Sequence, residues 1–228
     1  MTTTIDPGPG ELDAGTWESI HFDAWVSGLL GEESTVSEFR PLIIGIDGRG
    51  GAGKSTLATR IQDARAGVEI ISTDDIAWHH SVLSWHPLLV EHVLEPIRRG
   101  EPVEYRPDAW VERGREGAIR VTRDARILIV EGTGTLDDQV LRYLDLSIWV
   151  QCDYDLARTR AIDRDVATGV NGDRQASVAF WEDWQREEVP YFIEQAPWSK
   201  ADAIVLGTSA VEVSEGQILI SKAPRSSS

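Results

Sequence analysis

The chain has few of the features that mark secreted, membrane or metal-cage proteins. Among its 228 residues there is a single cysteine, Cys152, which excludes an intramolecular disulfide and a cysteine-rich metal site. No apolar run approaches the roughly 18 residues that a membrane-spanning helix needs. Residues 1–10 lack both the basic and the apolar segments of a secretory signal. We therefore expect a cytoplasmic protein without a membrane partner.

Basic residues are scarce as well. The chain carries 22 Lys and Arg against 38 Asp and Glu, which gives a formal net charge of −16. Binding to a nucleic-acid backbone requires a basic face, so we expect no nucleic-acid partner. A small-molecule partner needs only a local basic pocket and fits this composition. The sequence leaves a homo-oligomer open.

Four of the 20 glycines lie within one stretch of eight residues. Residues 48–55 read GRGGAGKS, which fits the phosphate-binding pattern G-x-x-x-x-G-K-[ST] at every specified position. The apolar run 41–47 predicts a buried strand before this stretch, and a helix is predicted over 54–66 after it. A strand that leads through a glycine-rich turn into a helix N-terminus directs backbone N–H groups at one point, which suits a polyphosphate.

This loop predicts a site for ATP and Mg²⁺. Lys54 is expected to reach the β- and γ-phosphates, and the Ser55 hydroxyl is expected to ligate Mg²⁺. The alternative is a glycine-rich turn without a ligand, and the flanking strand and helix argue against it. The expected ATP-binding residues are Gly48, Arg49, Gly50, Gly51, Ala52, Gly53, Lys54, Ser55 and Thr56.

Apolar strands alternate with helical segments along the chain. Strands are predicted over 41–47, 68–73, 127–131, 144–150 and 201–206, and later helices over 87–99, 155–168 and 178–195. Such alternation is typical of βαβ units. We therefore predict an α/β protein of the P-loop NTPase type, with three α/β/α layers and a mostly parallel five-stranded sheet.

The two ends of the chain are predicted to differ from its middle. Residues 1–10 are rich in Thr, Pro and Gly and are expected to be disordered, and residues 223–228 are expected to form a loose tail. Between them we expect a single kinase domain over 11–222. This domain is predicted to begin with an amphipathic helix over 12–30, and an edge hairpin over 211–220 is a further expectation.

Acidic residues follow two of the predicted strands. Asp74 comes just after the second strand, and Glu131 ends the third. Ligands of parallel sheets bind at the carboxyl ends of the strands, and phosphoryl transfer needs Mg²⁺ and a carboxylate that accepts a hydroxyl proton. We therefore expect Ser55, Asp74 and Glu131 as metal ligands, with Asp74 also as the catalytic base. The alternative for Asp74 is a helix N-cap.

The predicted helix 155–168 carries Arg160 and Arg164, which share one helix face because they are four residues apart. Arginines that fold over a transferring phosphoryl group stabilise its charge. We therefore expect both arginines to act in catalysis as a lid, together with Lys54. A solvated face whose arginines pair with neighbouring aspartates is the alternative.

Tryptophan is abundant, with nine residues. Six of them lie outside the predicted strands, namely Trp78, Trp85, Trp110, Trp181, Trp184 and Trp198. These side chains either pack in the core or line an aromatic pocket for the acceptor. His79 lies just beyond Asp74 and is a further candidate for contact with the acceptor.

Residues 46–56, IDGRGGAGKST, resemble the opening of the uridine kinase group of P-loop kinases, which also includes phosphoribulokinase and bacterial pantothenate kinase. Later segments resemble motifs of the same group in the same order, over 73–76, 99–108, 130–132, 160–165, 190–192 and 201–205. The resemblance implies that Asp74 is the base and that Tyr105 binds the acceptor. It also implies that Arg160 lies on the lid helix.

The chain departs from the group on the acceptor side. Ile76 and Ala77 stand where the group has an aromatic pair, and the run 110–113 stands where it has a histidine. The expected acceptor-binding residues are Tyr105, Trp78, His79, Trp110 and Arg113. The acceptor stays open between a nucleoside, a sugar and a pantothenate-like alcohol.

Taken together, these features favour an ATP- and Mg²⁺-dependent kinase, similar to uridine kinase, that phosphorylates a hydroxyl of a small molecule. The alternative is a nucleotide-dependent regulatory or binding protein without acceptor phosphorylation. The tetrad Asn-Lys-x-Asp, with which GTPase switches read guanine, is absent from the sequence, and this absence favours the kinase.

Overall fold

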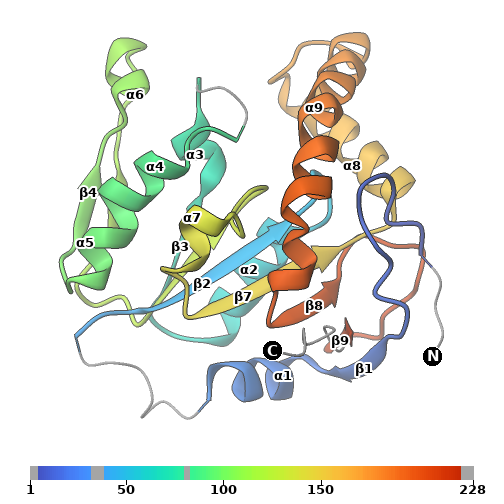
Figure 1. Cartoon of the computed structure of the whole chain (residues 1–228), viewed down its shortest axis with the longest axis horizontal. Helices are drawn as coiled ribbons and strands as arrows, with labels where there is room; N and C mark the ends of the chain where they lie inside the picture. Colours follow the sequence, from blue (N-terminus) through green and yellow to red (C-terminus); the bar gives the residue numbers. More distant parts are fainter. Residues whose placement is uncertain (1–4, 32–38, 80–82, 222–228) are drawn as a thin grey trace. The chain divides into compact units, whose positions relative to one another are not determined.

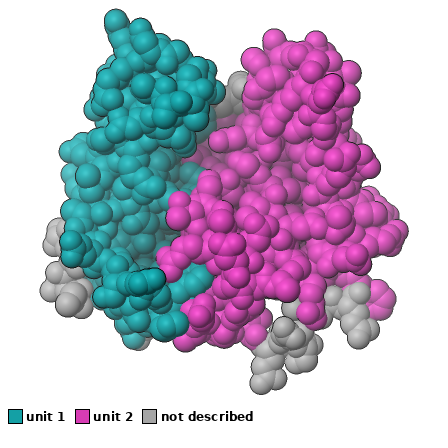
Figure 2. Space-filling model, turned by 180° about the vertical axis from the view of Figure 1, so that it is seen from behind, with its two compact units in different colours: residues 1–22, 48–54, 148–228 teal, residues 23–47, 55–147 magenta. Residues whose placement is uncertain are grey.

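The computed structural model describes residues 5–31, 39–79 and 83–221. The chain, predicted as one domain over 11–222, divides into two compact units (Figure 2). Unit 1 comprises residues 1–22, 48–54 and 148–228, and unit 2 comprises residues 23–47 and 55–147. The phosphate loop therefore belongs to unit 1, whereas Ser55 and the rest of the helix that follows it belong to unit 2.

The strands of unit 1 lie in the order β1-β9-β8-β7 (Figure 1). In that order they span Glu18–His21, Gln217–Ser221, Ala203–Leu206 and Leu146–Gln151. β7 and β8 are parallel, with Ile148 opposite Ala203, and β9 runs antiparallel to both β8 and β1. Most residues of β7 and β8 are buried, as expected of parallel strands that are covered on both faces.

Two long helices, α8 (Tyr154–Thr168) and α9 (Arg174–Gln195), complete unit 1, with a short 3₁₀ turn over Pro197–Lys200. Each long helix begins at an aspartate cap. Asp153 accepts a hydrogen bond from Leu156 N at 3.2 Å, and Asp173 accepts one from Ala176 N at 2.9 Å. α8 packs against α9 through a cluster formed by Ala161, Ile162 and Trp181.

In unit 2, three parallel strands lie in the order β2-β6-β3. They span Leu42–Gly48, Ile127–Glu131 and Val68–Ser72. Ile46 and Ser72 both lie opposite Glu131 in register, so the carboxyl ends of the strands are aligned. A small antiparallel sheet of β4 (Val103–Tyr105) and β5 (Ile119–Val121) stands apart from them.

The described helices considered next lie wholly or mostly in unit 2. They are α1 (Phe22–Leu30), α2 (Lys54–Ala64), α3 (Thr73–Ala77), α4 (His86–Leu89), α5 (Glu95–Arg98), α6 (Asp108–Glu112) and α7 (Asp138–Leu141). A π-helical segment over Val90–Leu94 joins α4 directly to α5, so the helix predicted over 87–99 is present but changes its hydrogen-bond pattern in the middle. Pro96, which lacks an N–H group, follows this segment. None of the described helices is long and apolar enough to cross a membrane.

The predicted α/β class and the mostly parallel sheet are confirmed, and the five predicted strands correspond to β2, β3, β6, β7 and β8. The predicted strand number was too low, because β1 and β9 bring it to seven. β9 falls near the predicted edge hairpin but covers only the end of it.

The predictions for the N-terminal region were partly wrong. The helix predicted over 12–30 begins only at Phe22, because Glu18–His21 pairs with β9 as strand β1. Residues 5–10, expected to be disordered, include buried Ile5 and a hydrogen bond from Tyr154 N to Asp6 O of 2.8 Å. Residues 1–4 and the predicted loose tail 223–228 lie outside the described residues.

Candidate active site

The phosphate loop of unit 1 is closed around its own lysine. Lys54 Nζ donates hydrogen bonds to Gly48 O at 2.8 Å and to Arg49 O at 3.0 Å. Gly51 has φ +74, and a Cβ there would lie 2.2 Å from the Ala157 carbonyl oxygen of α8, so only glycine fits this close approach. The loop is therefore pressed against the start of α8, with the lysine held on its backbone carbonyls.

Residue Thr208, which follows β8, supports the loop from a second direction. Its backbone N–H donates to Ala52 O, and its Oγ1 donates to Gly51 O, both at 2.8 Å. Sequence reasoning missed Thr208. The only signal in this part of the chain was the family resemblance of residues 201–205, which ends before Thr208.

The two predicted lid arginines have different partners. Arg160 Nη1 donates a hydrogen bond of 2.6 Å to Thr208 Oγ1, so this guanidinium lies at the loop's support. Arg164 instead pairs with its neighbour Asp165 at 2.8 Å, which is the alternative that the sequence left open. Both arginines are exposed.

In unit 2, the predicted carboxylates stand at neighbouring strand ends. Glu131 ends β6 and is only 5% exposed, and Asp74 is exposed in the first turn of α3, two residues beyond Ser72. Gly132 has φ +148, and a Cβ there would lie 1.7 Å from Thr73 Oγ1. The absence of a side chain at Gly132 lets the end of β6 meet the start of α3, next to both carboxylates.

The predicted Mg²⁺ ligands are the Ser55 hydroxyl at the start of α2 and these two carboxylates, all in unit 2. Across residues 5–31, 39–79 and 83–221, no group of three or more His, Cys, Asp or Glu side chains could hold a metal on its own. Mg²⁺ beside a nucleotide commonly uses one or two carboxylates, waters and phosphate oxygens. The residues present therefore fit a nucleotide-bound Mg²⁺ and do not form an all-protein cage.

Sequence reasoning also missed Asp47, which is fully buried near the end of β2. Its carboxylate accepts hydrogen bonds from Gly134 N at 3.0 Å and from Leu136 N at 2.8 Å, so it holds the loop that follows Glu131. The same loop contacts His86 through Gly134 O at 3.1 Å, and burial lowers the pKa of His86. A charged residue inside an otherwise apolar strand was the signal for Asp47.

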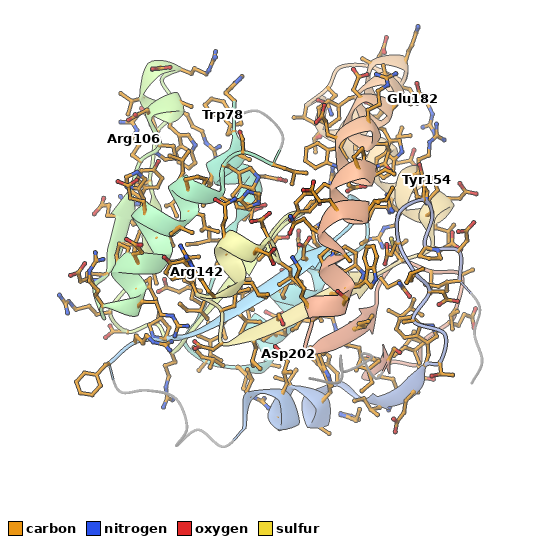
Figure 3. All side chains as sticks on the ribbon, viewed as in Figure 1. Trp78, Arg106, Arg142, Tyr154, Glu182 and Asp202 are labelled. Carbon is orange, nitrogen blue, oxygen red and sulfur yellow. The ribbon has the colours of Figure 1, made fainter. Side chains whose placement is uncertain are left out.

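The expected acceptor residues of unit 2 gather around an arginine that the sequence did not single out. The Arg115 guanidinium lies 3.6 Å from the Trp110 ring centroid and 5.2 Å from that of Trp78, and it pairs with Asp75. Trp110 Nε1 donates to Asp75 O at 2.9 Å. Figure 3 shows Trp78 at the end of α3. Together these contacts tie α3, which carries Asp74, to the segment around α6.

The other expected acceptor residues are placed less centrally. Tyr105 stacks on His92 at 4.3 Å between ring centroids, and partial burial raises the pKa of its phenol. His79 is exposed and packs edge-on against Trp78. Arg113 is exposed at the end of α6, so Arg115 takes the position beside the aromatic rings. Of the six tryptophans outside the predicted strands, four are buried core residues: Trp85, Trp110, Trp181 and Trp198.

Comparison with known proteins identifies the family of the chain. Residues 83–214, more than half of the chain, match the phosphoribulokinase / uridine kinase family. The chain is 33% identical over 145 residues to the uridine kinase of Clostridium novyi, covering 56% of this chain and 69% of that one. It is 30% identical over 145 residues to the uridine kinase of Lactiplantibacillus plantarum, again covering 56% and 69%.

A solved structure shares the fold. A candidate fructose transport system kinase from Silicibacter sp. TM1040 superposes with a TM-score of 0.54 at 19% identity, over 77% of this chain and 95% of that one. At this identity the likeness supports the fold alone. The chain belongs to the phosphoribulokinase / uridine kinase family and is a kinase that phosphorylates an alcohol group.

Proposed function

We propose that the chain transfers the γ-phosphoryl group of ATP, with Mg²⁺, to a hydroxyl of a nucleoside, a sugar or a pantothenate-like alcohol. The observation that carries the proposal is the close approach of Gly132 to Thr73. Beside this contact, Glu131 ends β6 and Asp74 lies two residues beyond Ser72, the register partner of Glu131 on β3. This is where an α/β sheet of this type binds its ligand.

Each residue has a defined part in the proposed reaction. The amides of the loop and Lys54 bind the phosphates, and Arg160 neutralises charge on the transferring group. Ser55, Asp74 and Glu131 would hold Mg²⁺, which would shield the phosphate charge. Asp74 accepts the proton of the acceptor hydroxyl, whose oxygen forms a bond to the γ-phosphorus while the bond to the bridging β–γ oxygen breaks and ADP leaves.

The acceptor side of the proposal rests on the contacts around α3. Asp75, Trp78, Trp110 and Arg115 fix this short helix, and a rigidly held helix orients the carboxylate of Asp74 toward the acceptor. We propose a cytoplasmic enzyme that acts on a small molecule and has no nucleic-acid partner, since its net charge is −16.

The experiment compares Asp74→Asn with the control variant Asp63→Asn. Loss of the general base should lower kcat by a factor of about 10² to 10⁴, while the affinity for ATP stays near the wild-type value. Asp63→Asn removes an exposed carboxylate of helix α2 in the same unit, and it should lower kcat far less. Full activity of Asp74→Asn, or an equal loss in both variants, would show that Asp74 is not the base.

A further inference from the structure

Arg49, the second residue of the phosphate loop, is fully buried although it is charged. Its guanidinium lies over the rings of Tyr154 at 5.1 Å and Phe192 at 4.9 Å. Burial of an unpaired charge is costly, so such a group needs close partners. Arginine at this position is not specified by the phosphate-binding pattern, so its burial requires another explanation.

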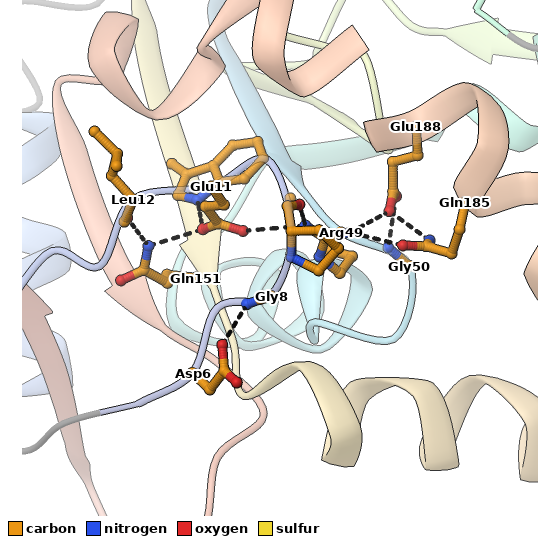
Figure 4. Close-up of polar contacts among 12 residues, drawn as sticks. Asp6, Gly8, Glu11, Leu12, Arg49, Gly50, Gln151, Gln185 and Glu188 are labelled. Atoms are coloured by element: carbon orange, nitrogen blue, oxygen red, sulfur yellow. Dashed lines mark hydrogen bonds and ion pairs between the residues drawn. The ribbon is translucent and has the colours of Figure 1, made fainter. Parts of the chain in front are cut away.

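The first partner is Glu188 of α9, which is also fully buried (Figure 4). Arg49 Nη1 donates to Glu188 Oε2 and to Gln185 Oε1, each at 2.8 Å. The other carboxylate oxygen, Glu188 Oε1, accepts from the Gly50 backbone N–H at 3.2 Å and from Trp184 Nε1 at 3.0 Å. One carboxylate therefore binds both the side chain and the backbone of the loop.

The second partner is the N-terminal segment, here residues 5–14 (Figure 4). Arg49 Nη2 donates to Pro9 O at 2.8 Å, and Glu11 Oε2 lies 3.9 Å from the same nitrogen. Glu11 Oε1 accepts from Trp149 Nε1 at 2.6 Å and from Gln151 Nε2 at 2.8 Å, which fixes the segment on β7. Arg49 is thus held between α9 and the N-terminal segment.

These contacts fix Arg49, and the backbone of Arg49 in turn binds Lys54. Arg49 O is one of the two carbonyls that accept hydrogen bonds from Lys54 Nζ. A side chain that cannot turn keeps its own backbone carbonyl in place, and the Glu188 contact keeps the next amide, Gly50 N, in place as well. Arg49 O therefore shares with Gly48 O the hydrogen bonds that hold Lys54 Nζ.

We propose that Arg49 is a positioning residue of the phosphate loop, which Glu188 and the N-terminal segment hold so that Lys54 and the loop amides are preorganised for the phosphates of ATP. The proposal rests on ATP being the donor. Preorganised donors bind more tightly because less ordering remains to be done on binding. Lysine cannot replace arginine here, because it cannot make the forked contacts to Glu188 and Pro9.

The test measures the affinity of the full chain for ATP and for AMP by calorimetry with Mg²⁺ present. Arg49→Lys should weaken ATP binding by about tenfold or more, equivalent to about 1.4 kcal/mol, and AMP binding by less, because AMP lacks the phosphates that Lys54 reaches. Glu188→Gln keeps the shape of the anchor and should shift ATP affinity in the same direction. A merely structural role would not separate ATP from AMP.

The matched control is Arg40→Lys, in unit 2. Arg40 makes a forked pair with Asp145, at 2.6 and 2.9 Å, and this variant should leave ATP affinity within about twofold. Thermal unfolding identifies the variants that fold. Wild-type ATP affinity in folded Arg49→Lys or Glu188→Gln, or equal losses for ATP and AMP, would overturn the proposal. A wild-type chain that binds no ATP would refute the proposed donor, and this proposal with it.

Discussion

Arg160 Nη1 and Thr208 Oγ1 are joined by a hydrogen bond of 2.6 Å, and the same threonine hydroxyl donates to the loop carbonyl Gly51 O at 2.8 Å. Arg160, which the sequence predicts as a lid residue, therefore contacts the threonine that supports the phosphate loop, within unit 1. Because the threonine hydroxyl carries no charge, this hydrogen bond does not neutralise the positive charge of the arginine. Arg164, by contrast, is already paired with Asp165.

This difference predicts unequal effects of the two arginines on catalysis. Arg160→Met should lower kcat by a factor of about 10² to 10³, as the loss of one group that stabilises transition-state charge does in other enzymes. Arg164→Met should have a smaller effect, because Asp165 already neutralises its guanidinium. Steady-state kinetics at saturating ATP check this prediction, and equal losses in the two variants would contradict it.

Thr208→Val tests the hydrogen bonds of the Thr208 hydroxyl separately from the charge of the Arg160 guanidinium. Valine keeps the shape of threonine but cannot bond to Arg160 or Gly51 O, whereas the guanidinium itself remains. We expect Thr208→Val to lower kcat/KM for ATP by about tenfold. The loss of kcat/KM for ATP in Arg160→Met should be clearly larger. A loss as large as that of Arg160→Met would mean that the hydroxyl, and not the arginine charge, is the functional group.

Gly132→Ala tests the close approach between the end of β6 and the start of α3. The new Cβ would lie 1.7 Å from Thr73 Oγ1, at φ +148, so the variant should lower the free energy of unfolding by about 2–4 kcal/mol. The matched control is Gly28→Ala in helix α1, where a Cβ meets nothing within 4 Å and alanine favours the helix by about 0.5–1 kcal/mol. Urea unfolding measures both, and an equally stable Gly132→Ala protein would contradict the geometry.

Glu131→Gln tests the metal assignment. Removing one anionic ligand should raise the Mg²⁺ concentration for half-maximal activity by about tenfold and lower kcat. Glu104→Gln is the control, because its carboxylate is 69% exposed and pairs with Arg120 on the small antiparallel sheet. An unchanged Mg²⁺ dependence in Glu131→Gln would exclude Glu131 as a ligand.

Glu11 predicts a pH dependence of stability. Burial raises its pKa from 4.5 to about 7, so between these values the folded chain keeps a proton that the unfolded chain has released. Its contribution to the free energy of unfolding is therefore full below about pH 4.5, falls as the pH rises, and is lost above about pH 7. Glu11→Gln removes this titration.

The stability of Glu11→Gln relative to wild type should accordingly increase between about pH 5 and about pH 8, by up to about 3 kcal/mol. Urea unfolding at the two pH values measures the change. A difference that stays constant with pH would show that Glu11 ionises at its ordinary pKa in the folded chain.

The parts of the fold that the sequence predicted are those with a local signal. The apolar run before the glycine-rich stretch, and the apolar run ending in Glu131, predicted β2 and β6 because buried parallel strands need continuous apolar residues. β1 has no such signal. Its residue Glu18 pairs with Ile220, near the other end of the chain, so tertiary pairing overrode the helical spacing of residues 12–30.

The same distinction applies to the site. The phosphate loop, Asp74 and Glu131 could be predicted because motif and strand end lie together in the sequence. The roles of Arg49, Thr208 and Arg115 could not, since their partners are distant in sequence, such as Glu188 for Arg49. Contact of Arg113 with the acceptor stays a prediction. The contact of Arg115 with the Trp110 ring could not be predicted, because the sequence of a short loop does not reveal which of two nearby arginines faces an aromatic ring.

The most direct test of the central claim is ADP release by the wild-type chain with ATP and Mg²⁺, in the presence and absence of a panel of nucleosides, sugars and pantothenate-like alcohols, with mass spectrometry of the products. The account predicts that ADP release depends on one class of acceptor and that this acceptor gains one phosphoryl group at a hydroxyl. Tight ATP binding with no acceptor-dependent ADP release across the whole panel would contradict it and would favour a nucleotide-dependent regulatory protein.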